Sequence, residues 1–186
     1  VYADRHENGS LGKTECWYIM DCGENASLVM GHNARTRDGL AEMINGHKWK
    51  ELIREVPIHK GDFFQINPGT VHAIKGGTLI LETQQNSDIT YRVYDYDRLQ
   101  NGKPRELHVR QSIDVITVPA APVDDCRVRT QDMPADTLNK LYDCRYYTVY
   151  KIDVNKGFTF SIRFPFMLMS VLSGDGKGNG GQVREG

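Results

Sequence analysis

Apolar and alternating positions predict that most of the chain forms β-strands. Residues 15–20 and 26–30 are dense aromatic and β-branched runs, and the turn-prone segment between them predicts a hairpin. Further strands are predicted at residues 63–66, 78–83, 90–96, 146–152, 158–162 and 166–172. Their spacing is typical of an antiparallel sandwich or barrel, so the predicted fold class is mainly β.

Helical spacing is confined to two regions of the sequence. Residues 36–44 carry apolar side chains at helical spacing after Thr36, a residue type that favours the N-cap position. A second short helix is predicted near Trp49, so that residues 36–54 form a small helical insert among the strands. One more helix is predicted within residues 105–116, before a proline-containing segment that ends it.

The composition excludes several classes of partner. The net charge is −1, with 25% charged and 39% hydrophobic residues, so nothing favours nucleic acid or an anionic membrane over a small-molecule partner. The four cysteines contain no CxxC pair, which favours reduced thiols and a cytoplasmic location. No apolar run approaches the ~18 residues of a membrane span, and the amino end lacks a signal-peptide pattern. The oligomeric state is not predicted.

Candidate chemistry lies in two short segments. Gly61, Gly69 and His72 follow the spacing G-x(7)-G-x-x-H, in which a turn places the histidine at the start of a strand, pointing into the mouth of a barrel. Lys13 and Glu15 stand two residues apart at the start of a predicted strand, so their side chains share one face. Taken alone, such a pair is a surface ion pair worth at most ~1 kcal/mol, and a single histidine is more often structural than a metal ligand.

Four motifs occur in order along the chain: GKTECWYI, NPGTVHAI, LILETQQNSD and TYRVYDYDR. Together they resemble the class I mannose-6-phosphate isomerases of the short bacterial type, within the cupin superfamily, and the resemblance covers nearly the whole chain. It implies a cupin jelly roll and a single zinc ion held by a Gln-x-His pair, a glutamate and a later histidine. By motif, Glu15 and His72 are two of these ligands, and the Gln-x-His pair is expected upstream of Val1.

The resemblance also implies a reaction: the interconversion of mannose 6-phosphate and fructose 6-phosphate by proton transfer through a cis-enediol. Lys13 and Glu82 both match candidates for the catalytic base, and the sequence does not rank them. Arg92 matches the active-site arginine, and Arg98 is a candidate for binding the phosphate. The structural alternative is that Glu82 pairs with Arg92, and that both arginines lie on a solvated strand face.

The expected domain organisation follows from the same resemblance. Residues 1–118 are expected to form a cupin catalytic domain that is incomplete at its amino end, residues 119–145 a connection, and residues 146–186 a truncated second β-domain. The absence of an initiating methionine and the glycine-rich end favour a chain cut at both ends. The alternative to a zinc enzyme is a metal-free cupin module that binds sugars or serves regulation without turnover.

Overall fold

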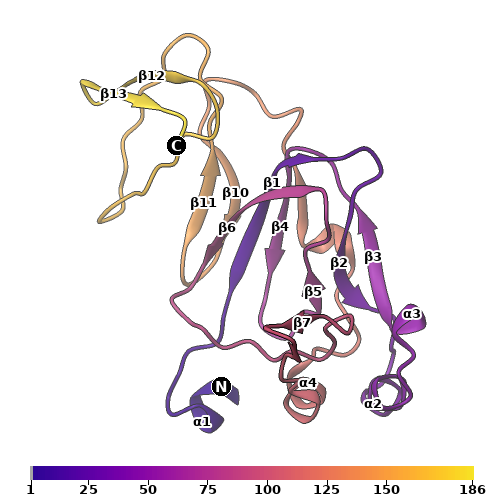
Figure 1. Cartoon of the computed structure of the whole chain (residues 1–186). Coiled ribbons are helices and arrows are strands. Elements are labelled where there is room, and N and C mark those ends of the chain that lie inside the picture. Colours follow the sequence, from indigo (N-terminus) through magenta and orange to yellow (C-terminus); the bar gives the residue numbers. More distant parts are fainter. Residues whose placement is uncertain (1) are drawn as a thin grey trace. The chain divides into compact units, whose positions relative to one another are not determined.

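The structure is a computed structural model that describes residues 2–186. The chain divides into two compact units (Figure 1). The first contains the residues up to Asp132 together with Cys144–Tyr146, and the second contains Met133–Asp143 and Tyr147–Gly186. No helix in the described part of the chain is long and apolar enough to cross a membrane.

Two antiparallel sheets form the framework of the first unit. The four-stranded sheet has the order β6-β1-β4-β9, and the three-stranded sheet has the order β3-β2-β5. The strands of the first sheet are β6 (Thr78–Gln84), β1 (Glu15–Cys22), β4 (Asp62–Ile66) and β9 (Arg127–Arg129). Those of the second are β3 (Ile53–Pro57), β2 (Ser27–His32) and β5 (His72–Ala73). Since β1 and β2 are inner strands, each has a hydrogen-bonded neighbour on both sides.

The main core lies where the two sheets face each other. Strand alternation turns Trp17 and Ile19 of β1 inward, next to Phe64 and Ile66 of β4. From the other sheet the core receives Leu28 and Met30 of β2, Val56 of β3 and the following residue Ile58. Because inward-facing side chains of both sheets form one cluster, apolar burial holds the sheets together.

Short helices supply a second apolar cluster. The helices are α1 (Tyr2–His6), α2 (Arg37–Asn45), α3 (Trp49–Leu52) and α4 (Val109–Val115), and η1 (Val123–Asp125) is a 3₁₀ turn. Thr36 is the N-cap of helix α2, and its side chain accepts a hydrogen bond from the Gly39 amide. Leu40, Ile44 and Leu52 from this insert pack against Ile116, at the end of α4. The insert lies at the end of the second sheet where β3 begins (Figure 1).

The remaining strands form separate two-stranded ladders. In the first unit β7 (Leu99–Gln100) pairs with β8 (Lys103–Pro104). In the second unit β10 (Asn139–Asp143) pairs with β11 (Thr148–Lys151), and β12 (Asp175–Gly178) pairs with β13 (Gly181–Arg184).

The prediction of a mainly β fold is confirmed, but several details differ. The predicted hairpin of residues 15–20 and 26–30 is wrong, because β1 pairs with β4 and β6 whereas β2 lies in the other sheet, between β3 and β5. Residues 119–145, expected to be a connection, supply β9 and β10, and β9 extends the first sheet by pairing with β4. Residues 90–96 do not form the predicted strand; the backbone turns into the left-handed region at Tyr96, with a φ of 54°. Residues 158–162 and 166–172 are also irregular, because alternation alone does not supply a partner strand for the backbone.

Candidate active site

Glu15 is the centre of the candidate site. It begins β1 and lies opposite Ile66 of β4 and Gln84 of β6, so strands on both sides fix its backbone. Its side chain is only 1% exposed. A carboxylate buried to this degree requires cationic or hydrogen-bonding partners, because an uncompensated charge in the interior is very costly.

Two side chains supply the compensation. His72 Nε2 lies 2.9 Å from Glu15 Oε1, and Lys13 Nζ lies 2.8 Å from Glu15 Oε2. Burial alone would raise the pKa of Glu15, but the contacts with His72 and Lys13 outweigh it and place this pKa below its ordinary value. Glu15 is therefore a carboxylate at neutral pH, and the sequence-predicted pair Lys13 and Glu15 is present as an ion pair.

His72 is oriented by the turn that precedes it. Its Nδ1–H donates to the Thr70 carbonyl at 2.8 Å, which leaves Nε2 directed at Glu15. Trp17 packs edge-on against the imidazole, with the ring centroids 5.2 Å apart. In metal-binding histidines a backbone carbonyl often fixes one ring nitrogen so that the other can bind the metal, and the bond to Thr70 fixes Nδ1 of His72 in this way.

Glu82 reaches the same site from β6. It pairs in register with Trp17, whose indole Nε1–H donates to Glu82 Oε2 at 2.9 Å. Lys13 Nζ lies 3.9 Å from Glu82 Oε1, so the ammonium group stands between two carboxylates. Glu82 is the more accessible of the two, with its side chain 36% exposed. Trp17 is buried in the main core and also orients Glu82.

Arg92 and Arg98 belong to a different cluster. Arg98 donates to Asp95 Oδ1 at 2.8 Å, and Arg92 Nε lies 3.8 Å from the same oxygen. Arg105 also binds Asp95, through Nε–H to Oδ2 at 2.8 Å. The alternative that Glu82 pairs with Arg92 is therefore not what the structure shows. The carboxylate near Arg92 is that of Asp95. Sequence reasoning gave no role to Asp95, although it lies within the motif TYRVYDYDR, and missed Arg105, which no motif marks.

The two clusters are neighbours through the loop that carries the arginines. Val93, Tyr94 and Tyr96 line a cavity of about 50 Å³ together with His72. Trp49 of α3 completes this wall by stacking on Tyr94, with the ring centroids 4.5 Å apart. The arginine-bearing loop thus packs beside the histidine of the candidate site.

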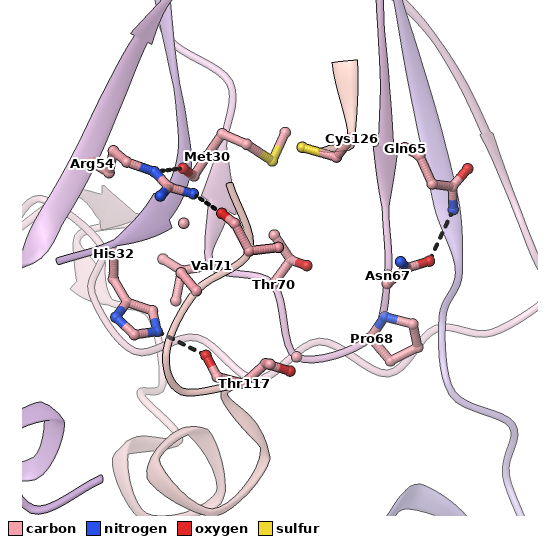
Figure 2. Close-up of a pocket in the computed structure, with 14 residues that line it drawn as sticks. Met30, His32, Arg54, Gln65, Asn67, Pro68, Thr70, Val71, Thr117 and Cys126 are labelled. Carbon is pink, nitrogen blue, oxygen red and sulfur yellow. Dashed lines mark hydrogen bonds between the residues drawn. The ribbon is translucent and has the colours of Figure 1, made fainter. Parts of the chain in front are cut away.

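A larger cavity lies behind the turn that orients His72. It measures about 230 Å³, and Figure 2 shows His32 and Arg54 on one side of it, with Gln65 and Asn67 on the other. The polar groups on the first side hold backbone: His32 Nε2–H donates to the Thr117 carbonyl at 2.9 Å, and Arg54 Nε–H donates to the Met30 carbonyl at 2.7 Å. These bonds fix the cavity wall, while the acidic residues of the candidate site do not line this cavity.

The residues of the site fit a zinc ion as part of its ligand set. Glu15 and His72 are ligand types that zinc prefers, and they already converge. The second oxygen of Glu15, Oε2, lies 2.8 Å from Lys13 Nζ and is therefore paired with a cation. Among residues 2–186, no group of three or more His, Cys, Asp and Glu side chains is arranged to hold a metal. A complete zinc site therefore needs ligands in addition to Glu15 and His72.

Comparison with known proteins gives a consistent result. No family model matches the chain. Mannose-6-phosphate isomerase ManA of Bacillus subtilis (strain 168) is 48% identical over 177 residues, which are 95% of this chain and 56% of that protein. Mannose-6-phosphate isomerase of Streptococcus mutans serotype c is 42% identical over 178 residues, 95% of this chain and 55% of that protein.

A solved structure extends the likeness to the fold. The crystal structure of the mannose 6-phosphate isomerase from Bacillus subtilis matches with a TM-score of 0.72 and 46% identity, over 83% of this chain and 49% of that one. The chain spans about half the length of the relatives it matches. It is therefore a homologue of the bacterial mannose-6-phosphate isomerases.

Proposed function

We propose that this chain carries catalytic residues of a zinc-dependent aldose–ketose isomerase that interconverts mannose 6-phosphate and fructose 6-phosphate. The observation that carries the proposal is the continuous set of contacts from Glu82 through Lys13 and Glu15 to His72. Such a set combines metal-ligand types with a partly exposed carboxylate and an ammonium group, which are the groups that proton transfer next to a carbonyl requires. The similarity to named isomerases supports the same reaction.

Zinc has a defined place in this proposal. Glu15 and His72 would hold the ion, in a cupin-type barrel formed by the two facing sheets. When bound, zinc would act as a Lewis acid on the sugar oxygens that gain charge in the enediol. The backbone anchor on His72 Nδ1 keeps Nε2 available for this role.

Proton transfer falls to Glu82 in this arrangement. Its Oε2 is held by Trp17 while the side chain stays partly exposed, so the carboxylate is both positioned and accessible to substrate. Lys13 contacts Glu15 and Glu82 together, and its ammonium group holds the two carboxylates in one site. Arg92 and Arg98 would bind the anionic parts of the substrate. Since the substrate is a metabolite with a phosphate group, we place the protein in the cytoplasm.

A metal-free cupin module that binds sugar phosphates without turnover is the second candidate. It is favoured by the finding that the described residues contain no group of three or more metal-ligating side chains. Zinc content and turnover distinguish the two functions. The isomerase binds zinc in a stoichiometric amount and converts mannose 6-phosphate, whereas the module binds the sugar phosphate and converts none.

The test compares His72→Ala with His59→Ala, a change at an exposed histidine outside the site. Zinc content and mannose 6-phosphate turnover are measured on this chain and on the full product of its gene. We expect His72→Ala to remove both zinc and turnover, and His59→Ala to retain both. Full activity in His72→Ala contradicts the metal assignment, and a zinc-loaded protein without isomerisation contradicts the enzyme.

A further inference from the structure

Asp95 is a buried carboxylate that three arginines surround. Its side chain is 7% exposed and accepts hydrogen bonds from Arg105, at both oxygens, and from Arg98. Arg92 Nε lies 3.8 Å from Asp95 Oδ1. The Arg105 guanidinium, with help from Arg98, holds the pKa of Asp95 well below its usual range. Asp95 is therefore ionised at neutral pH and acts as the shared anchor of three cations.

The three arginines are held to different degrees. Arg105 makes a two-point contact with the carboxylate, a geometry that fixes both partners. Arg98 makes one contact with the side chain and a longer one with the Asp95 carbonyl, and its side chain stays 62% exposed. Arg92 donates to the Glu106 carbonyl at 3.1 Å, so part of its guanidinium is also fixed by backbone. Arg105 is thus the structural partner, and Arg92 and Arg98 keep donors available.

The local charge is positive. Three guanidinium groups face one carboxylate, which leaves an excess of two positive charges within this cluster. Asp97 and Glu106 are exposed acids on the same segments, and Glu106 contributes its carbonyl rather than its carboxylate to Arg92. Planar donors on guanidinium groups match the oxygens of a phosphate dianion.

The loop geometry depends on the same carboxylate. Tyr96 and Asp97 both have φ of 54°, and this pair of left-handed residues turns the chain back so that the Arg98 amide donates to the Asp95 carbonyl at 3.1 Å. A tyrosine in this region is disfavoured and persists only where its surroundings impose it. Arg105 imposes it from outside the loop, since its two bonds reach Asp95 from the segment after β8.

We propose that Asp95 and Arg105 are positioning residues that hold Arg92 and Arg98 as a binding site for a phosphate monoester dianion. Arg92 and Arg98 are on the loop whose Val93, Tyr94 and Tyr96 line a cavity together with His72, so the proposed phosphate site and the candidate active site share this loop. The inference rests on the proposed function for the identity of the phosphate compound. The proposed site would bind the phosphate group of any small phosphate compound, so inorganic phosphate is a sufficient probe.

The experiment measures inorganic phosphate binding by isothermal titration calorimetry at fixed ionic strength, with thermal unfolding as a check on folding. Asp95→Asn distinguishes a positioning role of Asp95 from a purely electrostatic one, because the two roles predict opposite changes in phosphate affinity. Removing a negative charge from an anion site would tighten binding if charge alone mattered. Positioning predicts that binding weakens by about tenfold or more, because the arginines lose their common anchor.

Arg105→Lys provides a second comparison that keeps the net charge and loses the two-point contact. We expect an affinity between that of the unchanged chain and that of Arg105→Ala. Lys103→Ala is the matched control, since it removes an exposed cation from the same segment and should change affinity by less than about twofold. KM for mannose 6-phosphate should follow the phosphate affinity in the same order.

Three results overturn the inference. They are tighter phosphate binding in folded Asp95→Asn, equal binding in Arg105→Lys and the unchanged chain, and absence of phosphate binding to the unchanged chain. A chain that binds phosphate in the predicted order but shows no isomerisation supports the positioning role and contradicts the proposed function. Failure of the positioning role and failure of the proposed isomerase function therefore give different results.

Discussion

Gly69 occupies a position where the addition of one methyl group should be costly. It lies in the turn before His72 with a φ of +88°. A Cβ at this position would stand 2.6 Å from the Val115 carbonyl oxygen and 2.7 Å from Thr117 Oγ1. The Thr117 amide also donates to the Gly69 carbonyl at 2.9 Å, so the facing segment is hydrogen-bonded in place and has little freedom to move away.

Gly77 provides a matched control for the Gly69→Ala change. Its φ is +76°, and no atom lies within 4 Å of a Cβ built there. Both alanine variants incur the left-handed backbone cost of about 1–2 kcal/mol, offset by about 0.4–1 kcal/mol from the less flexible unfolded chain. Gly69→Ala adds a steric cost of about 1–3 kcal/mol. We therefore expect about 1 kcal/mol of destabilisation for Gly77→Ala and about 2–4 kcal/mol for Gly69→Ala.

Urea unfolding followed by tryptophan fluorescence measures both changes, because Trp17 lies in the main core. Gly69→Ala should also lower zinc affinity, since displacement of the turn moves the Thr70 carbonyl that orients His72. Equal loss of stability in the two variants would refute the reasoning, because it would show that the close contacts of Gly69 do not constrain the turn.

Three further predictions concern the two charged clusters. Glu82→Gln should lower kcat by about 10²- to 10⁴-fold with little change in KM, as steady-state kinetics will show, because the amide cannot accept the proton. Trp17→Phe should lower kcat by about tenfold through loss of the bond to Glu82, and no change in kcat would contradict this orienting role. Asp95→Asn should destabilise the fold at pH 7, and urea titrations should show this effect declining as the pH falls below about 4. The pKa of Asp95 is lower in the folded chain than in the unfolded chain, so ionised Asp95 stabilises the fold. This stabilisation is fully present above the pKa of the unfolded chain and is lost as the pH falls through the pKa of the folded chain.

The sequence predicts the parts of the site that depend on spacing within regular strands. Lys13 precedes Glu15, the first residue of β1, by two residues and contacts it, as the predicted alternation requires, and His72 follows a glycine-bounded turn of fixed length. Glu82 lies near the end of a predicted strand, residues 78–83, that does pair with β1. In each case local periodicity determines the direction of the side chain, so its position in the site can be predicted from the sequence alone.

The arginine-bearing loop shows where such prediction fails. Alternation over residues 90–96 predicts a strand, yet the side chains of this segment are held by tertiary contacts: Trp49 stacks on Tyr94, and Arg105 binds Asp95. Neither partner is a neighbour along the chain, and neither follows a periodic rule. The position of Arg92 and Arg98 around a carboxylate is consequently a property of the fold, as is the pairing of β9 with β4 inside the expected connection.

The inner strand β1 joins the packing of the main core to the candidate active site. Along its inward face and the residues before it, Lys13, Glu15 and Trp17 follow one another at intervals of two. Each reaches a group from another element: Lys13 and Trp17 contact Glu82, and Glu15 contacts His72. Because Trp17 is also part of the main core, the packing that joins the two sheets fixes the direction of Glu82. Core substitutions that shift β1 against β6 should therefore impair turnover before they unfold the chain.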